Sequence, residues 1–320
     1  MGLDDVRAQV ALFGVAGPAA IAFVATLLAA IAFKSARKPD AKDVTARAGV
    51  GSAFGLAGAF VLANVGMDGV PERMPVAAAE WALPLVALAG VLACLDALAF
   101  TSTKRHFVRW LGRLVIIAAF VLGPMARTRQ NFWEGTEAVL WIGGTVVWFL
   151  LAFAASDQTA SKSSPRGHAI VAMALAGGLV PVIFGAGVTV QSQVAGAVAA
   201  AAGGIVAATL IMRKSIPPTH AMGTIVVAWV AAMLTLSWQF VAEMAWWEFG
   251  VIAAIPLLVA AVDLIPGLKG LSSFKRLAVR LGIVIAATAA VSGHHVPSMY
   301  EQLGGGGASD DPYGDYWDSL

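Results

Sequence analysis

The sequence predicts an all-α protein, a polytopic transmembrane helix bundle of about ten spans arranged as repeated helical hairpins. Three observations lead to this fold class. The 320 residues are 59% hydrophobic and only 12% charged, which lies outside the range of soluble globular proteins. Apolar runs of about 20 residues, the length that crosses roughly 30 Å of hydrocarbon, recur along the chain. Basic residues gather between alternate runs, as expected for a chain that crosses a membrane repeatedly.

Ten apolar runs qualify as spans. Their approximate limits are 10–33, 48–68, 79–100, 107–125, 137–155, 169–188, 193–212, 221–241, 247–266 and 276–293. They are too long and too uniformly apolar for barrel strands, which alternate over about 10 residues. Runs six and seven are the weakest predictions, because VTVQSQ at 188–193 leaves a very tight turn. The first run is not read as a cleaved signal peptide, since an acidic leader precedes it and a basic cluster follows it.

The charge distribution predicts the orientation. Segments after the odd-numbered spans hold 17 of the 21 basic residues, and the opposite segments hold 14 of the 19 acidic residues. By the positive-inside rule, both termini face outward, on the periplasmic side of a bacterial cytoplasmic membrane. An organelle membrane is the alternative. The net charge of +2 gives no indication of nucleic-acid binding.

Two hairpins repeat one sequence pattern. FVRWLGRLVIIAA at 107–119 and FKRLAVRLGIVIA at 274–286 share the pattern D-x10-F-x-R-x3-R-L with the preceding aspartates. The clearest repeats are therefore 79–125 and 247–293, with weaker relatives that begin at Asp157 and Thr209. The two clear copies point the same way, which favours duplicated hairpins over an inverted-repeat transporter.

The repeated charges predict structural ion pairs. Asp96 meets the negative end of its helix dipole, and Arg109 and Arg113 share one helix face at the positive end of the next helix. A charge-assisted pair across the short turn offsets both penalties. The same argument pairs Asp263 with Arg276 or Arg280. In one alternative, the arginines reach lipid phosphates and the aspartates are simply solvated. In the other, the arginines form a dedicated site for an anionic ligand.

No catalytic residue is predicted. The middles of all ten spans lack Asp, Glu, Lys, Arg and His, which argues against a proton relay, a voltage sensor or an ion-coupled pump. The single cysteine, Cys94, excludes a disulfide framework and a thiolate metal site. Glycine patterns such as GAGVTV lack the strand context of a nucleotide loop. The protein is therefore not expected to be an enzyme.

The histidines give no metal or cofactor site. His106, His168 and His220 lie at inner helix starts, whereas haem or pigment between helices needs ligands within the bilayer. GHH at 293–295 lacks a clear carboxylate or cysteine partner, so an interfacial cap is expected there rather than a metal. No cofactor is predicted, and bound lipids are expected. A pigment, haem or quinone at an interface stays open. Trp141, Trp148 and Trp229 are read as helix-packing or lipid-facing bulk, with a quinone or pigment pocket as the alternative.

Small residues and prolines indicate how the helices meet. Gly51, Gly55 and the pair Gly203–Gly204 are expected to allow close helix approach. Pro84, Pro181 and Pro256 are expected to kink their helices. A broken helix around GGLVPVIFG at 177–185 is the most transporter-like feature.

The chain divides into a bundle at 1–303 and a tail at 304–320 that is glycine-rich, then acidic and aromatic. Such a tail cannot fold alone but suits docking onto a partner. The candidate partner-binding residues are Asp310, Asp311, Tyr313, Tyr316 and Trp317. The sequence therefore favours a non-catalytic integral subunit of a larger membrane complex, which contacts lipids and other subunits. The alternative is a transporter or channel for a neutral or apolar small solute.

Overall fold

The computed structural model describes residues 8–35, 49–70, 75, 78–98, 102–126, 135–186, 189–212, 220–239, 244–268 and 270–302. Every regular element in these ranges is helical. Seven of the described helices are long and apolar enough to cross a membrane. The all-helical fold class is therefore confirmed, and the helices suit a membrane bundle.

The helices follow one another along the chain with short connections. The first half contains η1 (Val10–Ala16), α2 (Gly17–Ser35), α4 (Gly49–Asp68), η2 (Ala78–Trp81), α5 (Ala82–Leu98), α6 (Ser102–Phe120) and η3 (Val121–Met125). The second half contains α8 (Gly135–Lys162), α9 (Pro165–Gly185), α10 (Thr189–Met212), α11 (His220–Gln239), α12 (Trp246–Ala261), η4 (Pro266–Leu268) and α13 (Ser273–Gln302). The π-helical segment η1 leads directly into α2, and the π-helical segment η3 directly follows α6.

Each of the ten predicted spans coincides with a helix in the described ranges. Three of these helices, namely α5, α11 and α12, carry apolar stretches shorter than the other seven. The 16 residues of α12 rise only about 24 Å, somewhat less than a hydrocarbon core. Ten crossings, and the side on which each terminus lies, stay predictions.

Several helix ends differ from the predicted limits. Helix α8 continues to Lys162, seven residues beyond the predicted end at 155, and this extension places Asp157 inside a helix. Helix α13 likewise continues through Pro297 to Gln302 and carries GHH within it. Helix α9 begins at Pro165, where the Ser164 hydroxyl accepts from the Gly167 amide at 3.0 Å, so serine followed by proline is the start signal here.

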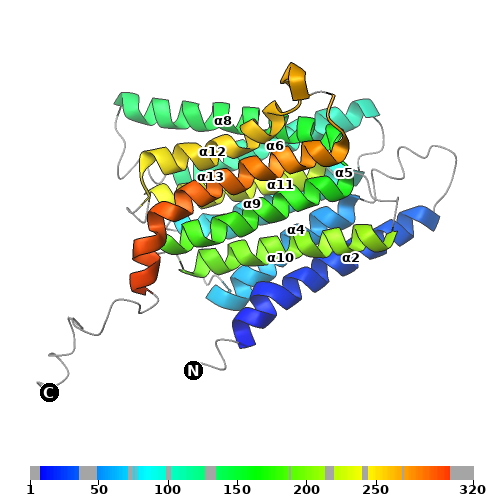
Figure 1. The fold of residues 1–320 in the computed structure, drawn as a ribbon, viewed down its shortest axis with the longest axis horizontal. Helices are drawn as coiled ribbons and strands as arrows, with labels where there is room; N and C mark the ends of the chain where they lie inside the picture. The colour runs from blue at the N-terminus through cyan, green and yellow to red at the C-terminus, as the bar shows by residue number, and fades with distance from the viewer. Residues whose placement is uncertain are drawn as a thin grey trace, which may run out of the picture.

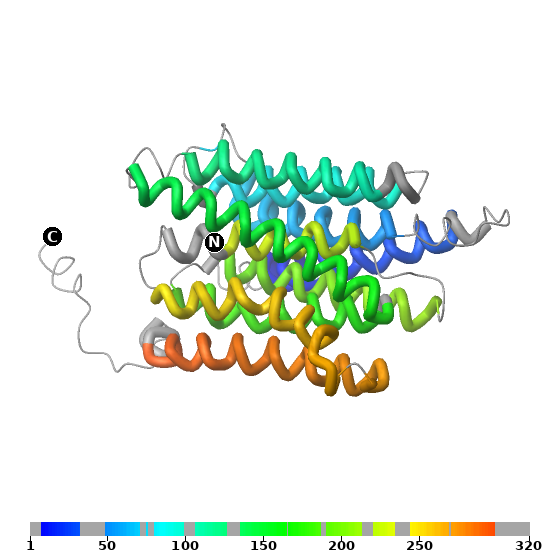
Figure 2. Tube along the Cα trace, turned by 90° about the horizontal axis from the view of Figure 1, so that it is seen from above, coloured from blue at the N-terminus to red at the C-terminus, as the bar shows by residue number. Residues whose placement is uncertain are grey.

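The long helices lie side by side, and the described chain begins and ends at the same end of the bundle (Figure 1). Helix α10 packs against α9, α2 and α4, and helix α13 packs against α9 and α12. Helix α8 runs obliquely across the bundle and packs mainly on α11 and α12 (Figure 2). The hairpins α2–α4, α5–α6 and α12–α13 pack as pairs, whereas α8 barely touches α9 because its oblique course carries it away. The described chain therefore does not form the uniform series of packed hairpins that the repeated sequence pattern predicted.

Close helix approach depends on particular glycines. A Cβ added to Gly55 of α4 would lie 2.6 Å from the Cα of Ala22 on α2. A Cβ on Gly204 of α10 would clash with the carbonyl oxygen of Ala19. The predicted role of glycine is therefore confirmed at these two positions. The transporter-like alternative of a broken helix at 177–185 is not found, because α9 continues through Pro181 to Gly185 without interruption.

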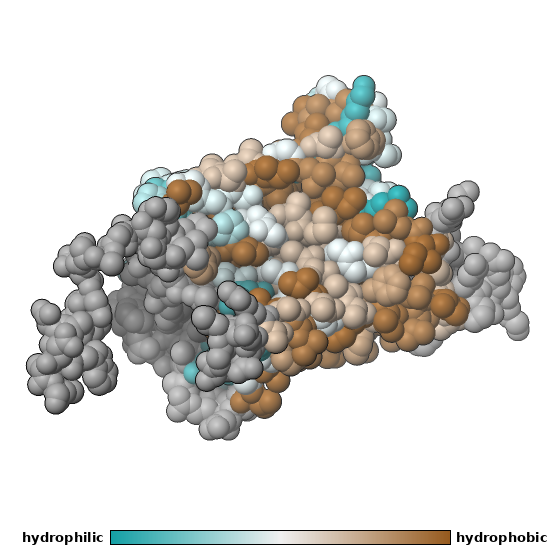
Figure 3. All heavy atoms as spheres, turned by 60° about the horizontal axis from the view of Figure 1, so that its bottom comes forward, coloured by the Kyte–Doolittle hydropathy of each residue, from teal (hydrophilic) through white to brown (hydrophobic). Residues whose placement is uncertain are grey.

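The outer surface of the bundle is apolar. Large hydrophobic side chains are exposed on most of the helices, including Leu28, Phe54, Leu122 and Val139. In Figure 3, apolar residues cover most of the described surface on the face shown. Exposed apolar area on this scale would be a liability in water and suits contact with lipid.

Candidate functional site in the interior of the bundle

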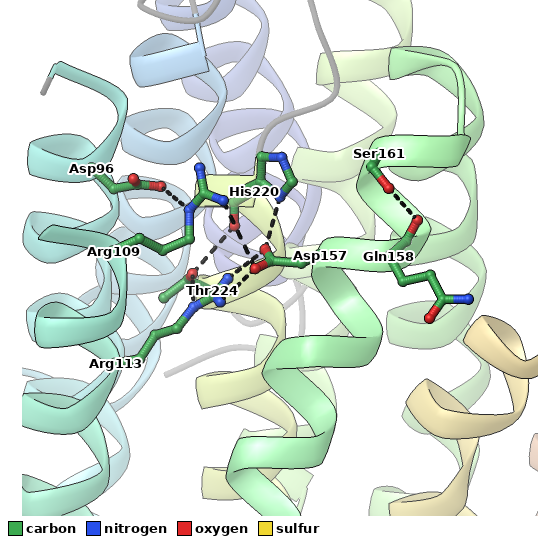
Figure 4. A network of polar contacts seen from close by, with 8 residues as sticks. All are labelled: Asp96, Arg109, Arg113, Asp157, Gln158, Ser161, His220 and Thr224. Atoms are coloured by element: carbon green, nitrogen blue, oxygen red, sulfur yellow. Dashed lines mark hydrogen bonds and ion pairs between the residues drawn. The ribbon is translucent and has the colours of Figure 1, made fainter. Parts of the chain in front are cut away.

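A network of charged side chains connects four helices near one end of the bundle (Figure 4). On α5 and α6, Arg109 Nε lies 3.1 Å from Asp96 Oδ2. On α6 and α8, the guanidinium of Arg113 holds Asp157 through two bonds, with Nη1 2.7 Å from Oδ2 and Nη2 2.7 Å from Oδ1. Helix α11 completes the network, because His220 Nδ1 lies 2.8 Å from Asp157 Oδ1.

Arg113 is the centre of this network. Its side chain has no exposed surface, and its guanidinium lies 5.1 Å from the Trp110 ring and 5.0 Å from the Phe153 ring. The planar group therefore has aromatic faces beside it and a bidentate carboxylate at its edge, the geometry in which arginine binds most strongly. Thr224 accepts a longer bond from Arg113 Nε at 3.5 Å and donates to the His220 carbonyl at 3.2 Å.

The structure changes the predicted pairing of the first hairpin. Of the two arginines, Arg109 reaches Asp96, whereas Arg113 pairs with Asp157 of a different hairpin. The reason is spacing, since four residues along a helix move Arg113 about 6 Å deeper into the bundle. There, the extended end of α8 presents Asp157. Arg109 Nη1 also lies 3.8 Å from Asp157, so this carboxylate faces both arginines.

The second hairpin brings its predicted residues together. Asp263 Oδ2 lies 2.5 Å from Arg280 Nη2, and Asp263 Oδ1 lies 3.5 Å from Arg276 Nε. Arg280 also donates to the hydroxyl of Ser163, which precedes α9. Asp263 and Arg280 are both buried. This second cluster therefore ties α12 and α13 to each other and to the connection between α8 and α9.

His168 lies between the two clusters. It is buried in the first turn of α9, and neither ring nitrogen has a hydrogen-bond partner among the described residues. Beside it is a cavity of about 50 Å³, lined by residues of α8, α9, α11 and α12 that include Ser156, Gly223 and Pro256. Sequence reasoning placed His168 at a helix start but gave no sign that its side chain points inward.

The expectation that GHH at 293–295 has no carboxylate partner is wrong. Glu248, in the first turn of α12, is fully buried, and its Oε1 lies 2.6 Å from His294 Nδ1 and 3.3 Å from His295 Nε2. The second carboxylate oxygen accepts from the Ala245 amide at 2.8 Å and caps the helix. Because Glu248 is far from the histidines along the chain, only the packing of α12 against α13 brings these side chains together.

An aromatic cavity of about 320 Å³ opens between α6, α8, α11 and α12. Its lining consists of Phe120, Leu140, Trp141, Gly144, Thr145, Trp148, Ala231 and Phe249. Trp148 also donates from Nε1 to the carbonyl of Ala253 on α12 at 2.8 Å. The two tryptophans therefore line this cavity, and Trp148 also packs α8 against α12.

The predicted partner-binding residues of the tail lie outside the described residues. These are Asp310, Asp311, Tyr313, Tyr316 and Trp317. Comparison of the chain with protein-family models, with curated proteins and with solved structures finds no match. The class is therefore defined by the fold and composition alone: the regular elements of the described residues are all helical, seven of these helices are able to span a membrane, and charged networks connect the helices.

Proposed function

We propose that this chain is a non-catalytic integral membrane subunit of a larger membrane protein assembly. One observation carries the proposal: the buried acidic and arginine side chains in the described ranges all pair with side chains of the same chain. They are Asp96, Arg113, Glu248, Asp263 and Arg280. Charges that hold helices together serve the structure of the bundle, whereas a reaction or a charged solute needs a charge that is still available.

The surface and the tail support the same proposal. Exposed apolar side chains on most described helices form a surface that suits contact with lipid. Other membrane subunits can pack against the same surface within the bilayer. The segment 304–320 combines a glycine tether with aromatic residues among acids, a composition suited to docking. In this proposal the bundle anchors the assembly and the tail binds a partner.

Purification of the tagged full-length chain from its native membrane in mild detergent tests this proposal. We expect companion proteins at a fixed ratio to the chain, and we expect deletion of 304–320 to release them. The shortened chain must keep the thermal unfolding midpoint of the full chain, which separates loss of a partner from loss of folding. A full-length chain that purifies as a monomer or a simple homodimer contradicts the proposal.

A second candidate function is transport or conduction of a neutral or apolar small solute. The aromatic cavity of about 320 Å³ favours it, because this volume falls at the lower end of the range of small-molecule sites and the lining is mainly apolar. The buried charges of the described interior are already paired with one another, so they are not available to bind a charged solute. A small aromatic molecule is therefore the class of solute that fits.

Indole is a suitable probe for this second candidate. Gly144 lines the cavity and Gly143 does not, and a Cβ at either position meets no atom within 4 Å. We expect indole to raise the thermal unfolding midpoint of the original protein and of Gly143→Leu, but not that of Gly144→Leu, whose side chain fills the cavity. An equal shift, or no shift, in all three proteins contradicts binding in this cavity.

A further inference from the structure

Three metal-binding side chains converge at the end of the bundle opposite Asp263. Glu248 comes from the first turn of α12, and His294 and His295 come from α13. One potential ligand atom of each lies within 4.8 Å of those of the other two. Two imidazoles and one carboxylate form one of the ligand sets that proteins use for catalytic zinc, in which a fourth position stays open.

The distances fit a metal ion after a small adjustment. Bonds of about 2.0–2.1 Å in a tetrahedral site place neighbouring ligand atoms roughly 3.3 Å apart. The pair Glu248 Oε1 and His295 Nε2 already has this separation, at 3.3 Å. His294 Nδ1 is closer, at 2.6 Å from the same oxygen, and must move outward by under about 1 Å to admit an ion. It can do so, because 56% of the His294 side chain is exposed.

The surroundings hold the ligands in position. The Ala245 amide binds Glu248 Oε2 at 2.8 Å and so directs Oε1 toward the histidines. His295 is buried against Gly185 of α9, where a Cβ would clash with the His295 side chain. The ring of Trp247 meets His294 edge to face at 5.6 Å. Two of the ligands are therefore fixed within the protein and the third faces outward, which leaves a path for an ion.

The use of different ring nitrogens also points to a shared target. Consecutive residues on a helix point about 100° apart, so neighbouring histidines do not normally meet one group. Here His294 presents Nδ1 and His295 presents Nε2 to the same carboxylate oxygen. An ion pair with Glu248 is complete with one imidazole, and the second imidazole at the same oxygen supplies the third protein ligand of a metal site.

We propose that Glu248, His294 and His295 form a binding site for a divalent transition-metal ion, with Zn²⁺ as the best fit. The ion would join the ends of α12 and α13 opposite the Asp263–Arg280 pair, so that the two helices are tied at both ends. This site is independent of the proposed membrane-subunit function, and neither requires the other.

Zinc titration of the purified full-length chain in detergent tests this site. After removal of bound metal with a chelator and then removal of the chelator, calorimetry with Zn²⁺ alone gives the affinity and the number of ions per chain. We expect one ion per chain in the original protein and at least an approximately tenfold lower affinity in His294→Ala. His106→Ala is the matched control, because His106 is an exposed histidine on α6 and its loss should leave the affinity unchanged.

A second readout keeps the test independent of folding. Thermal unfolding without metal checks that His294→Ala is folded: a single cooperative transition is expected, at a lower midpoint, because the buried Glu248 carboxylate loses one of its partners. Visible absorption of Co²⁺ in place of Zn²⁺ should show a tetrahedral site in the original protein and lose that spectrum in His294→Ala. Equal Zn²⁺ affinity in the original protein, His294→Ala and His106→Ala means an adventitious ion only and overturns the proposal. Absence of saturable binding overturns it as well.

Discussion

Arg113 shows how a single residue organises the interior. It has no exposed surface, and its bidentate contact with Asp157 joins α6 to α8, while His220 on the other side of that carboxylate adds α11. Burial of this charge costs desolvation free energy, which its ion pair and hydrogen bonds with largely buried partners offset. Loss of one partner therefore leaves an uncompensated charge in an apolar environment.

We expect Arg113→Leu and Asp157→Asn each to lower the free energy of unfolding by about 3–5 kcal/mol, the cost of breaking a buried ion pair. The double variant should lose less than the sum of the two, by about 0.5–3 kcal/mol, because the second change removes the charge that the first left unpaired. Denaturant unfolding in detergent micelles measures all three values.

Lys162→Ala provides the control for these variants. Lys162 is an exposed cation at the end of the same helix as Asp157, and its removal should change the unfolding free energy by no more than about 0.5 kcal/mol. Strictly additive losses in the double variant would show that Arg113 and Asp157 do not depend on one another.

Individual helices follow local sequence signals to different degrees. The apolar runs correctly located ten helices, because a run of apolar residues needs no distant partner to form backbone hydrogen bonds. Their ends were predicted less well: α8 and α13 continue beyond the apolar runs, since polar residues such as Asp157 find partners on neighbouring helices. A limit set by hydrophobicity alone places such residues in loops.

Helix approach at Gly55 gives a prediction at this scale. We expect Gly55→Ala to lower the unfolding free energy by about 1–3 kcal/mol, because the new methyl group meets the Ala22 backbone of α2 at 2.6 Å. Gly58→Ala, one turn along the same helix, has its nearest neighbour at 3.7 Å and should be neutral or slightly stabilising. Thermal unfolding in detergent compares the two, and equal effects would contradict the packing of α4 on α2 described above.

The outer surface of the helix bundle is apolar, and in the predicted topology the basic residues gather at one end of the bundle. The seven long apolar helices of the described ranges suit a membrane, and the described chain begins and ends at one end of the bundle (Figure 1). The charge asymmetry of the sequence predicts that this end lies on the outer side.

Cysteine labelling tests this topology, because Cys94 is the single native cysteine and can be replaced by alanine. In that background, a cysteine at Asp4 or at Ser309 should react with an impermeant maleimide added to intact cells. A cysteine at Lys162 should react only after the membrane is opened. Opposite accessibility of Asp4 and Ser309 would exclude an even number of crossings.

The sequence by itself indicated the helical class, the positions of ten helices, and that Asp96 and Asp263 each face arginines of the next helix, because each depends on residues that are close along the chain. Which arginine each aspartate contacts was decided by the structure. Only the tertiary structure decided that Arg113 meets Asp157 and that Glu248 meets His294 and His295. These contacts join helices distant in sequence, and their geometry follows from the oblique course of α8 and the packing of α12 on α13. Hydrophobicity and charge spacing indicate which residues lie in the helices of the bundle. The angle at which two helices pack decides which of their side chains come into contact.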